Sequence, residues 1–417
     1  MKDTLPSLRE DNRLVVIDVL RGIAVSMVMI RHLAFNKTGI TGKLSSEAGQ
    51  YPGDWFNQFA SFGEYGVHLF LVLSGFCIHF RWAKKGDGSI PFLAFWKRRL
   101  VRLYPPFLVV LVLSLTSLFV LHGVLLKSFP NENVAAWFGY DSVTQLTIDL
   151  ALLLTLTQNL NGASQRVGNG PFWSLALEEQ LYMLYFPFLA LRRKYGWPVA
   201  LGVPVTITIL WRITGMVVFE TPPSFWFVTA PAFWCCWCLG ALAAESYTGR
   251  VSLPETTRSG GLLIVATAIA IALHELDRSE IGIIVTIVAK TGVDVAFGCV
   301  AFLLIQYGTR FELRVRDAMQ GWSFVGPVLN CTMAIGICSY SIYLTHDITF
   351  KAVKQILVEF GVPLPIVLAG RLASGIAVGC LFYFIVEKRF LKMSRRVRVE
   401  SVKVDGSGTE ADVELIT

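Results

Sequence analysis

The sequence contains few charged residues for its length. Only 16% of its 417 residues are Asp, Glu, Lys or Arg, whereas 54% are hydrophobic and the mean hydropathy is +0.56. A soluble globular domain carries about 25% charged residues. The hydrophobic residues here occur in runs of about 20, the length that a helix needs to cross a bilayer. The composition excludes a soluble enzyme and predicts a protein of many membrane-spanning helices.

Two marks of secreted proteins are also missing. No small-residue cleavage pattern follows the first hydrophobic run, and Arg21 and His32 lie inside it, so we expect a permanent first helix rather than a cleaved signal. All eight cysteines fall within hydrophobic runs, which argues against disulfides between loops. The cluster at residues 235–238 has no nearby His or carboxylate in sequence, and its helical spacing predicts packing rather than a metal site.

The hydrophobic runs predict an all-α membrane bundle of about ten spanning helices plus one shorter segment. That shorter run, residues 147–160, suits a re-entrant or interfacial segment better than a full crossing. The predicted spans are residues 14–35, 66–82, 104–126, 173–191, 197–219, 224–246, 259–276, 281–305, 329–351 and 366–391.

Basic residues decide the predicted orientation of these helices. With the N-terminus in the cytoplasm and ten crossings, 25 Lys and Arg residues belong to inner segments and 7 to outer segments. Basic residues concentrate in the cytoplasmic loops of membrane proteins, so both termini are expected there, and the net charge of +7 requires no nucleic-acid partner. We assign residues 1–13 to a cytoplasmic segment, 14–391 to the membrane domain and 392–417 to a disordered cytoplasmic tail.

The first predicted span carries two ionisable residues at membrane depth, where such groups are costly and commonly functional. Arg21 and His32 are eleven residues apart. That spacing is close to three helical turns, so the two residues share a face and lie about 16 Å apart along the axis. A purely structural alternative is that Arg21 pairs with Asp18 and that His32 lies at the membrane interface.

Acid–base groups recur near the predicted outer ends of four helices: His32, His68, Glu178 with Glu179, and His346 with Asp347. A charged first turn favoured by the helix dipole would explain the two glutamates without function, but Glu178 lies deeper than a first turn. A histidine oriented by a carboxylate is a common arrangement for taking a proton from a hydroxyl.

A basic cluster precedes the third predicted span on the opposite, inner side. It contains Lys97, Arg98, Arg99 and Arg102. Guanidinium groups suit phosphate oxygens because they donate two parallel hydrogen bonds. The alternative is an anchor that contacts lipid head groups.

Five of these patterns, in this order, resemble the acyltransferase 3 family of bacterial membrane O-acyltransferases. The resemblance extends over residues 13–391. Two residues depart from the family pattern, because Thr345 replaces a common tryptophan and Asp347 stands where an aromatic residue is frequent. The matching motifs are residues 17–24 with His32, 66–76, 98–105, 173–182 and 340–346.

The resemblance implies an enzyme of the inner membrane that uses acyl-CoA, most often acetyl-CoA, as a co-substrate entering from the cytoplasm, without a metal. It implies that Arg21 and His32 are essential and that Arg99 and Arg102 contact the donor. Acceptors across the family include surface polysaccharides, lipid-linked sugars and other glycolipids or glucans, so the expected partners are acyl-CoA, a carbohydrate or glycolipid and the membrane lipids.

Together these features predict a donor site on one side of the bundle and a catalytic base on the other. Arg98, Arg99 and Arg102 would hold the CoA phosphates, the thioester arm would pass Arg21, and His32 would take the acceptor's proton with Glu178 or Glu179 orienting its ring. We expect the acceptor to contact His68, Trp173 and His346.

Three alternatives stay open at this point. An acyl-histidine intermediate fits the same residues as general-base catalysis. A glycolipid or small-molecule transporter or flippase also fits ten helices with buried charges, although the sequence shows no internal repeat and a transporter would not need five ordered motifs. A non-catalytic scaffold in a polysaccharide assembly is disfavoured because Arg21, His32 and the glutamates are all intact.

Overall fold

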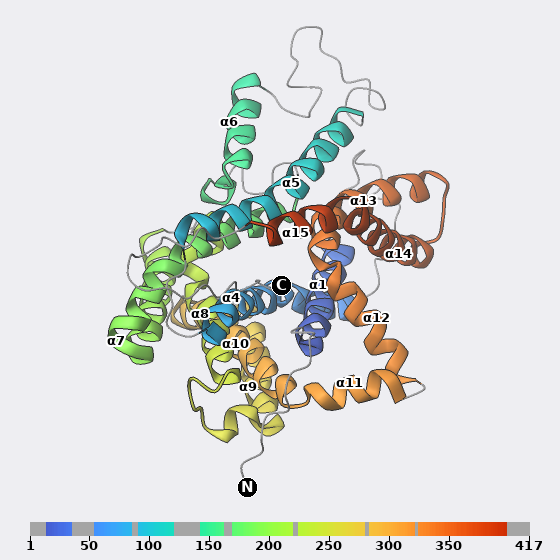
Figure 1. Cartoon of the computed structure of the whole chain (residues 1–417). Coiled ribbons are helices and arrows are strands. Elements are labelled where there is room, and N and C mark those ends of the chain that lie inside the picture. Colours follow the sequence, from blue (N-terminus) through green and yellow to red (C-terminus); the bar gives the residue numbers. More distant parts are fainter. Residues whose placement is uncertain are drawn as a thin grey trace, which may run out of the picture.

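The computed structural model describes residues 14–35, 54–85, 91–120, 142–161, 169–219, 224–279, 283–321 and 324–397, and all of its regular elements in these ranges are helices. Figure 1 shows their arrangement. The α-helices are α1 (Val15–Phe35), α3 (Asp54–Ser61), α4 (Tyr65–Lys85), α5 (Phe92–Phe119), α6 (Val143–Leu154), α7 (Phe172–Val218), α8 (Ala230–Tyr247), α9 (Gly260–Arg278), α10 (Ile283–Arg310), α11 (Glu312–Gly321), α12 (Val325–Ile337), α13 (Ser339–Glu359), α14 (Leu364–Phe382) and α15 (Lys388–Arg395). Shorter helical turns are η1 (Phe62–Glu64), η4 (Gln158–Leu160), η5 (Ser224–Val228), η6 (Glu255–Arg258) and η7 (Tyr383–Glu387).

The predicted membrane bundle is confirmed. Within the described ranges, seven helices are long and apolar enough to cross a membrane, or eight if the bent pair α12 and α13 forms one span. One of the seven is α7, whose 47 residues are two helices joined across a kink at Gly196. The first helix, α1, is 21 residues long and carries Asp18, Arg21 and Arg31 among its apolar residues.

Two predicted spans differ from the structure, and one shorter segment agrees with it. Residues 329–351 do not form one straight span, because α12 and α13 meet at Cys338 with a bend of 80°. The third span begins at Phe92 rather than at residue 104, because its arginines continue the helix instead of ending it. The short run at 147–160 forms α6, which has 12 residues and is too short to cross, as expected.

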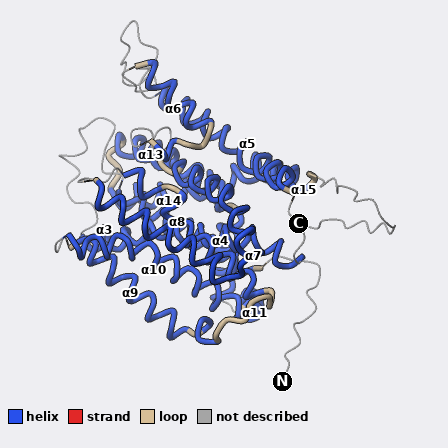
Figure 2. The backbone as a smooth tube through the Cα atoms, turned by 90° about the vertical axis from the view of Figure 1, so that its left-hand side faces the viewer, coloured by secondary structure: helices blue, strands red, loops and turns tan. Residues whose placement is uncertain are grey.

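The helices run side by side in one main group, from which α5 and α6 leave obliquely (Figure 2). At the centre of the group, α4 packs closely against α8. A Cβ atom added to Gly75 would lie 2.0 Å from the carbonyl oxygen of Trp237, and one added to Gly240 would lie 1.9 Å from that of Val72. Glycine therefore allows these two backbones to touch, as small residues commonly do between membrane helices.

A buried ionic network fixes the kink in α7. The carboxylate of Glu245 on α8 accepts hydrogen bonds from Arg192 (3.1 and 2.6 Å), from the indole of Trp197 (2.8 Å) and from His79 on α4 (3.0 Å). Arg192 and Trp197 lie on opposite sides of Gly196, whose φ of +76° favours glycine. The network thus holds both halves of α7 against α4 and α8.

Neighbouring helices hold α1 at both ends. At its start, the Glu312 carboxylate of α11 accepts hydrogen bonds from the backbone N–H groups of Val15 (2.8 Å) and Val16 (2.9 Å). At its end, the Arg371 guanidinium of α14 donates to the carbonyls of His32 (3.2 Å) and Leu33 (3.3 Å). Each partner has the charge that complements the helix dipole and satisfies terminal backbone groups.

The side of α1 that faces α12 is equally constrained. A Cβ atom on Gly336 would lie 1.8 Å from the carbonyl oxygen of Asp18, so the two backbones are in contact. We expect Gly336→Ala to push α12 away from α1 and to lower the stability by about 1–3 kcal/mol, the usual effect of overpacking. Thermal unfolding of the purified protein measures this as a lower Tm.

Gly202→Ala is the matched control for this substitution. Gly202 lies inside α7, and an added Cβ there would meet no atom within 4 Å. Alanine is a better helix former than glycine, so this variant should keep or slightly raise the Tm. Equal Tm values for the Gly336→Ala and Gly202→Ala proteins would contradict the close contact of α1 with α12.

Candidate active site

His32 lies near the end of α1, beside two residues of α13. Its Nδ1 atom lies 3.0 Å from Nε2 of His346 and 3.9 Å from Oδ1 of Asp347. The other ring nitrogen, Nε2, forms no hydrogen bond with any described residue, and 28% of the His32 side chain is exposed. One face of this imidazole is therefore engaged by the protein and the other is open to a substrate.

Backbone contacts of His346 determine how the two rings share protons. Its Nδ1 lies 3.1 Å from the carbonyl oxygen of Ile342 and 2.9 Å from that of Tyr343. Carbonyl oxygens only accept, so Nδ1 of His346 carries a proton and its Nε2 accepts when the ring is neutral. His32 must then donate from Nδ1, which leaves the lone pair on its open Nε2. This assignment of protons follows from the hydrogen-bond network.

Asp347 is the carboxylate nearest to His32, and it is buried. Its Oδ2 accepts a hydrogen bond from the backbone N–H of Gly170 (3.2 Å) and lies 2.8 Å from the Lys351 ammonium group. These contacts hold Oδ1 toward His32. The residue that departs from the family pattern thus supplies the negative charge that favours a protonated His32.

The two glutamates do not contact His32, so the expectation that one of them orients its ring is wrong for this structure. Glu178 accepts hydrogen bonds from Ser74 (2.9 Å) and from Tyr182, one turn later on α7. Glu179 is 6% exposed and forms no hydrogen bond with a described residue. The physical reason is depth: both lie more than one turn inside α7, where Glu178 interacts electrostatically with Arg21 and Glu179 with Arg99.

An arginine cluster, which we define as Arg81, Arg98, Arg99 and Arg102, lies where α4 and α5 approach each other. Its members are close enough to repel one another. The Arg99 guanidinium stacks 5.1 Å from the ring centroid of Tyr182, and Arg98 donates to the carbonyl oxygen of Val397 (3.3 and 3.1 Å).

None of these four arginines forms an ion pair with another described residue. The buried Nε of Arg102 has no hydrogen-bond partner in the described part of the chain. Four neighbouring cations repel one another, so an anion that binds among them would stabilise the arrangement. The arrangement suits a ligand with several phosphate oxygens.

Arg21 on α1 interacts electrostatically with this cluster through Arg102. Its guanidinium lies 3.4 Å from Asp18 and donates to the sulfur of Cys77 (3.2 Å). The pairing with Asp18 that the sequence offered as an alternative is therefore present. Because 27% of the Arg21 side chain is exposed, the pair leaves part of the guanidinium open.

Polar side chains connect the arginine cluster with His32. Ser174, Glu178 and Tyr182 follow one another at four-residue spacing and so share a face of α7. Tyr182 lies under Arg99 at one end of this row. At the other end, the Ser174 hydroxyl lies 2.5 Å from that of Tyr343, which is one turn before His346. The row therefore runs from the guanidinium groups to the histidine pair.

Two of the residues predicted to contact the acceptor, His68 and Trp173, form no hydrogen bond with His32 or His346. His68 does not reach His32 and instead bonds to Asp294 on α10 at 2.7 Å. Trp173 is partly buried and packs against the apolar core formed by α4, α7 and α8. Sequence reasoning missed Arg81 and Glu387 as site residues; Glu387, the last residue of η7, accepts a hydrogen bond from Ser341 (2.5 Å) and interacts electrostatically with Arg102 and Arg21. Arg81 carried a signal, since it stands one turn from the end of a membrane helix, but it was counted only as part of the basic inner segment.

Comparison with known proteins adds three findings. A sequence model of the acyltransferase 3 family, described as an acyltransferase domain, matches residues 14–385. The chain is similar to regulator of hypoxia-inducible factor 1 of Caenorhabditis elegans, with 27% identity over 216 residues that make up 50% of this chain and 39% of the relative. No solved structure matches it.

Two bacterial relatives are named as O-acetyltransferases. Peptidoglycan O-acetyltransferase OatA of Listeria monocytogenes is 29% identical over 190 residues, or 43% of this chain and 24% of that protein. A putative O-acetyltransferase of Staphylococcus aureus (strain COL) is 29% identical over 187 residues, or 43% of this chain and 26% of that protein. The chain thus spans between about a quarter and two fifths of the length of these curated relatives.

Proposed function

The chain belongs to the acyltransferase 3 family, and we propose that it is a membrane O-acyltransferase that transfers an acyl group from acyl-CoA to a hydroxyl of a carbohydrate-type acceptor. The observation that carries this proposal is the row of polar side chains that joins four arginines without ion-pair partners to an imidazole with a free lone pair. The names of the bacterial relatives support an acetyl group and a glycan acceptor.

The arginine cluster suits the donor. Coenzyme A carries a pyrophosphate and a ribose phosphate, so it offers the anionic oxygens that Arg98, Arg99 and Arg102 lack among the described residues. Guanidinium forks bind such oxygens with two parallel hydrogen bonds, and the stacking of Arg99 on Tyr182 fixes the direction of one fork. In this reading Arg81 is a fourth contact for the donor phosphates.

The thioester arm then extends along the polar row toward His32. Arg21 and His32 are about 16 Å apart along α1, a distance that an extended chain of coenzyme A has to cover between phosphates and sulfur. The arm passes Glu178 and the Ser174–Tyr343 pair, whose hydroxyl and carboxylate groups can bond its two amides. Glu178 and Glu179 therefore act on the donor in this proposal rather than on the imidazole.

His32 supplies the base at the end of the arm. Its Nε2 takes the proton from the acceptor hydroxyl while the hydroxyl oxygen attacks the thioester carbonyl. The carbon–sulfur bond then breaks and the CoA sulfur leaves as a thiol, taking up the proton that His32 received. Asp347, 3.9 Å from Nδ1, stabilises the imidazolium that exists between these two proton transfers. The same lone pair would attack the carbonyl directly if an acyl-histidine forms.

The charge distribution supports a donor site facing the cytoplasm and a histidine pair facing the opposite side of a bacterial inner membrane, with both termini in the cytoplasm. Single cysteines introduced at residue 100 and at residue 35 and labelled from either side of sealed vesicles would test this arrangement. Labelling of both from the same side would remove the geometry on which the transfer depends.

The activity itself is tested with purified protein in lipid nanodiscs and radiolabelled acetyl-CoA. We expect release of free CoA, with the label passing to water when no acceptor is present and to a glycan when cell-wall or surface glycans of the source cells are added. Mass spectrometry of surface glycans from a deletion strain should show a sugar that has lost one acetyl group. A protein that releases no CoA but moves a labelled glycolipid across vesicle membranes would instead be a transporter.

A further inference from the structure

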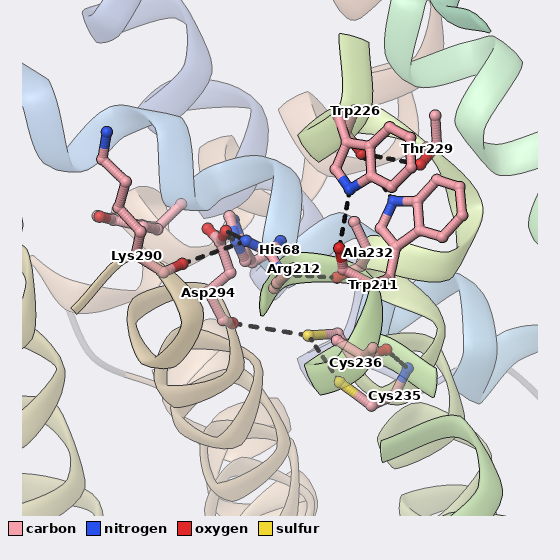
Figure 3. Close-up of polar contacts among 12 residues, drawn as sticks. His68, Trp211, Arg212, Trp226, Thr229, Ala232, Cys235, Cys236, Lys290 and Asp294 are labelled. Atoms are coloured by element: carbon pink, nitrogen blue, oxygen red, sulfur yellow. Dashed lines mark hydrogen bonds and ion pairs between the residues drawn. The ribbon is translucent and has the colours of Figure 1, made fainter. Parts of the chain in front are cut away.

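A second polar cluster lies on α4, α7 and α10, apart from the histidine pair (Figure 3). The Asp294 carboxylate lies 2.7 Å from Nε2 of His68 and 2.5 Å from Nη1 of Arg212. Arg212 also donates to the carbonyl oxygens of Ala232 (3.1 Å) and Lys290 (3.3 Å). His68 and Arg212 are 5% and 1% exposed, so both charged or polar groups are buried among apolar helices.

This cluster leaves buried hydrogen-bonding atoms unused. Nδ1 of His68 and Nη2 of Arg212 have no partner among the described residues, and the same holds for Oγ1 of Thr291 and Oδ1 of Asp277. Thr291 precedes Asp294 by one turn of α10, and Asp277 on α9 is close enough to interact with Asp294. An unmet buried donor or acceptor costs about 1–3 kcal/mol, so unpaired atoms on both side chains that contact Asp294, and on two further residues nearby, favour a bound polar ligand.

The chemistry of these atoms specifies the ligand. The Asp294 carboxylate accepts from Nε2 of His68, so in the neutral ring Nδ1 carries a lone pair and is an acceptor. Arg212 offers a donor, Thr291 offers both, and Asp277 offers an acceptor. The two carboxylates are balanced by Arg212 and Lys290, which leaves no excess charge for an ion to neutralise. Hydroxyl groups, which donate and accept at once, complement such a set.

An aromatic ring packs against the cluster. The Phe233 ring lies edge-on to His68, with 5.2 Å between ring centroids, its face lies 5.2 Å below the Arg212 guanidinium, and it is itself buried. The Asp294 side chain remains 20% exposed, so the cluster is not sealed from outside.

We propose that His68, Arg212, Asp294, Thr291 and Asp277 bind an uncharged sugar residue of the acceptor. That the bound sugar belongs to the acceptor rests on the proposed function, whereas sugar binding itself does not. The cluster adjoins the histidine pair through η1, since Glu64 at the end of η1, one turn before His68, bonds to Arg31 at 3.2 Å, and Arg31 is the neighbour of His32. Gly63 and Gly66 face α1, so the sugar site lies on the other side of α4 and holds a residue of the acceptor different from the acylated one.

Saturation-transfer NMR tests this with the full-length protein in nanodiscs, which contain no glycoside detergent. The probes are the methyl glycosides of glucose, galactose, mannose and N-acetylglucosamine. At least one should bind the wild-type protein. His68→Gln keeps an amide nitrogen to donate to Asp294 but removes the acceptor at Nδ1, so binding should weaken about tenfold. Thr291→Val removes a hydroxyl at constant shape and should weaken binding in the same direction.

Thr267→Val is the matched control, because the Thr267 hydroxyl on α9 already donates to the carbonyl oxygen of Leu263 at 2.7 Å. It should bind the probes as the wild type does. The proposal is overturned if no glycoside binds, which would mean that the cluster holds water only, or if His68→Gln and Thr291→Val bind as well as the control.

CoA release by the wild-type protein is measured in the same nanodiscs to separate the two proposals. Glycoside binding that is sensitive to His68→Gln, together with no release of CoA, would overturn the acyltransferase activity and leave the sugar site. Release of CoA without glycoside binding would overturn only the sugar site.

Discussion

Replacement of His32 with alanine is expected to slow acyl transfer about a thousandfold or more while acetyl-CoA still binds. A positioned base contributes about 10²–10⁴-fold to a rate, and His32 is the described residue at the end of the polar row with an unused lone pair. CoA release from radiolabelled acetyl-CoA gives the rate, and equilibrium binding of the donor gives its affinity. A His32→Ala protein that transfers acetyl at the wild-type rate would contradict the mechanism.

Variants of His346 separate positioning of His32 from general loss of structure. His346→Ala removes the atom that accepts from Nδ1 of His32, so the ring can rotate and the rate should fall about 10- to 100-fold. His346→Gln places an amide oxygen near the same position and should recover part of that loss, because the oxygen can still accept. Equal rates for the alanine and glutamine variants would show that His346 acts only through packing.

Replacement of Arg99 with alanine is expected to raise the KM for acetyl-CoA about 10- to 100-fold. A hydrogen bond between charged groups contributes about 1.5–3 kcal/mol, and Arg99 is the arginine whose direction is fixed by stacking on Phe95 and Tyr182. Arg99→Lys keeps the charge but loses the planar fork and should give an intermediate KM. Higher ionic strength should raise the wild-type KM as well, since salt screens the attraction.

Arg258→Ala is the control for charge alone, because Arg258 lies in η6 and bonds to Ser246, away from the arginine cluster. Its donor KM should stay at the wild-type value. If Arg99→Ala lowers the Tm and leaves the KM for acetyl-CoA unchanged, the stacking of Arg99 is structural and the donor binds elsewhere.

Helices and membrane class could be predicted from local sequence because each depends on one segment. An apolar run of about 20 residues must satisfy its backbone internally in lipid, whatever its neighbours are. The bend at Cys338 and the early start of α5 could not be predicted this way. The first depends on the contact of Gly336 with α1, and the second on arginines that a hydropathy window reads as a helix end.

Site residues on a single helix could be predicted from the sequence, but the contacts between residues on different helices could not. The depth of His32 in an apolar run marked it, but its partner is 314 residues away, and sequence alone does not say which of several acid–base groups at similar depth will meet. Glu178 was one of the two carboxylates predicted to orient the His32 ring, but it accepts a hydrogen bond from Ser74 instead. Asp347 was predicted as one of several acid–base groups and as a departure from a motif, and it is the carboxylate that His32 faces.

The contacts at the two ends of α1 fix the position of this helix along its axis. Glu312 fixes its first turn and Arg371 fixes its last, and between Val15 and His32 the chain rises about 25 Å. Because α1 is held at both ends, the position of the imidazole also depends on Glu312, a carboxylate about 25 Å away at the other end of the helix. A substitution that weakens the contact of Glu312 with α1 would therefore displace His32 without changing any residue of the active site.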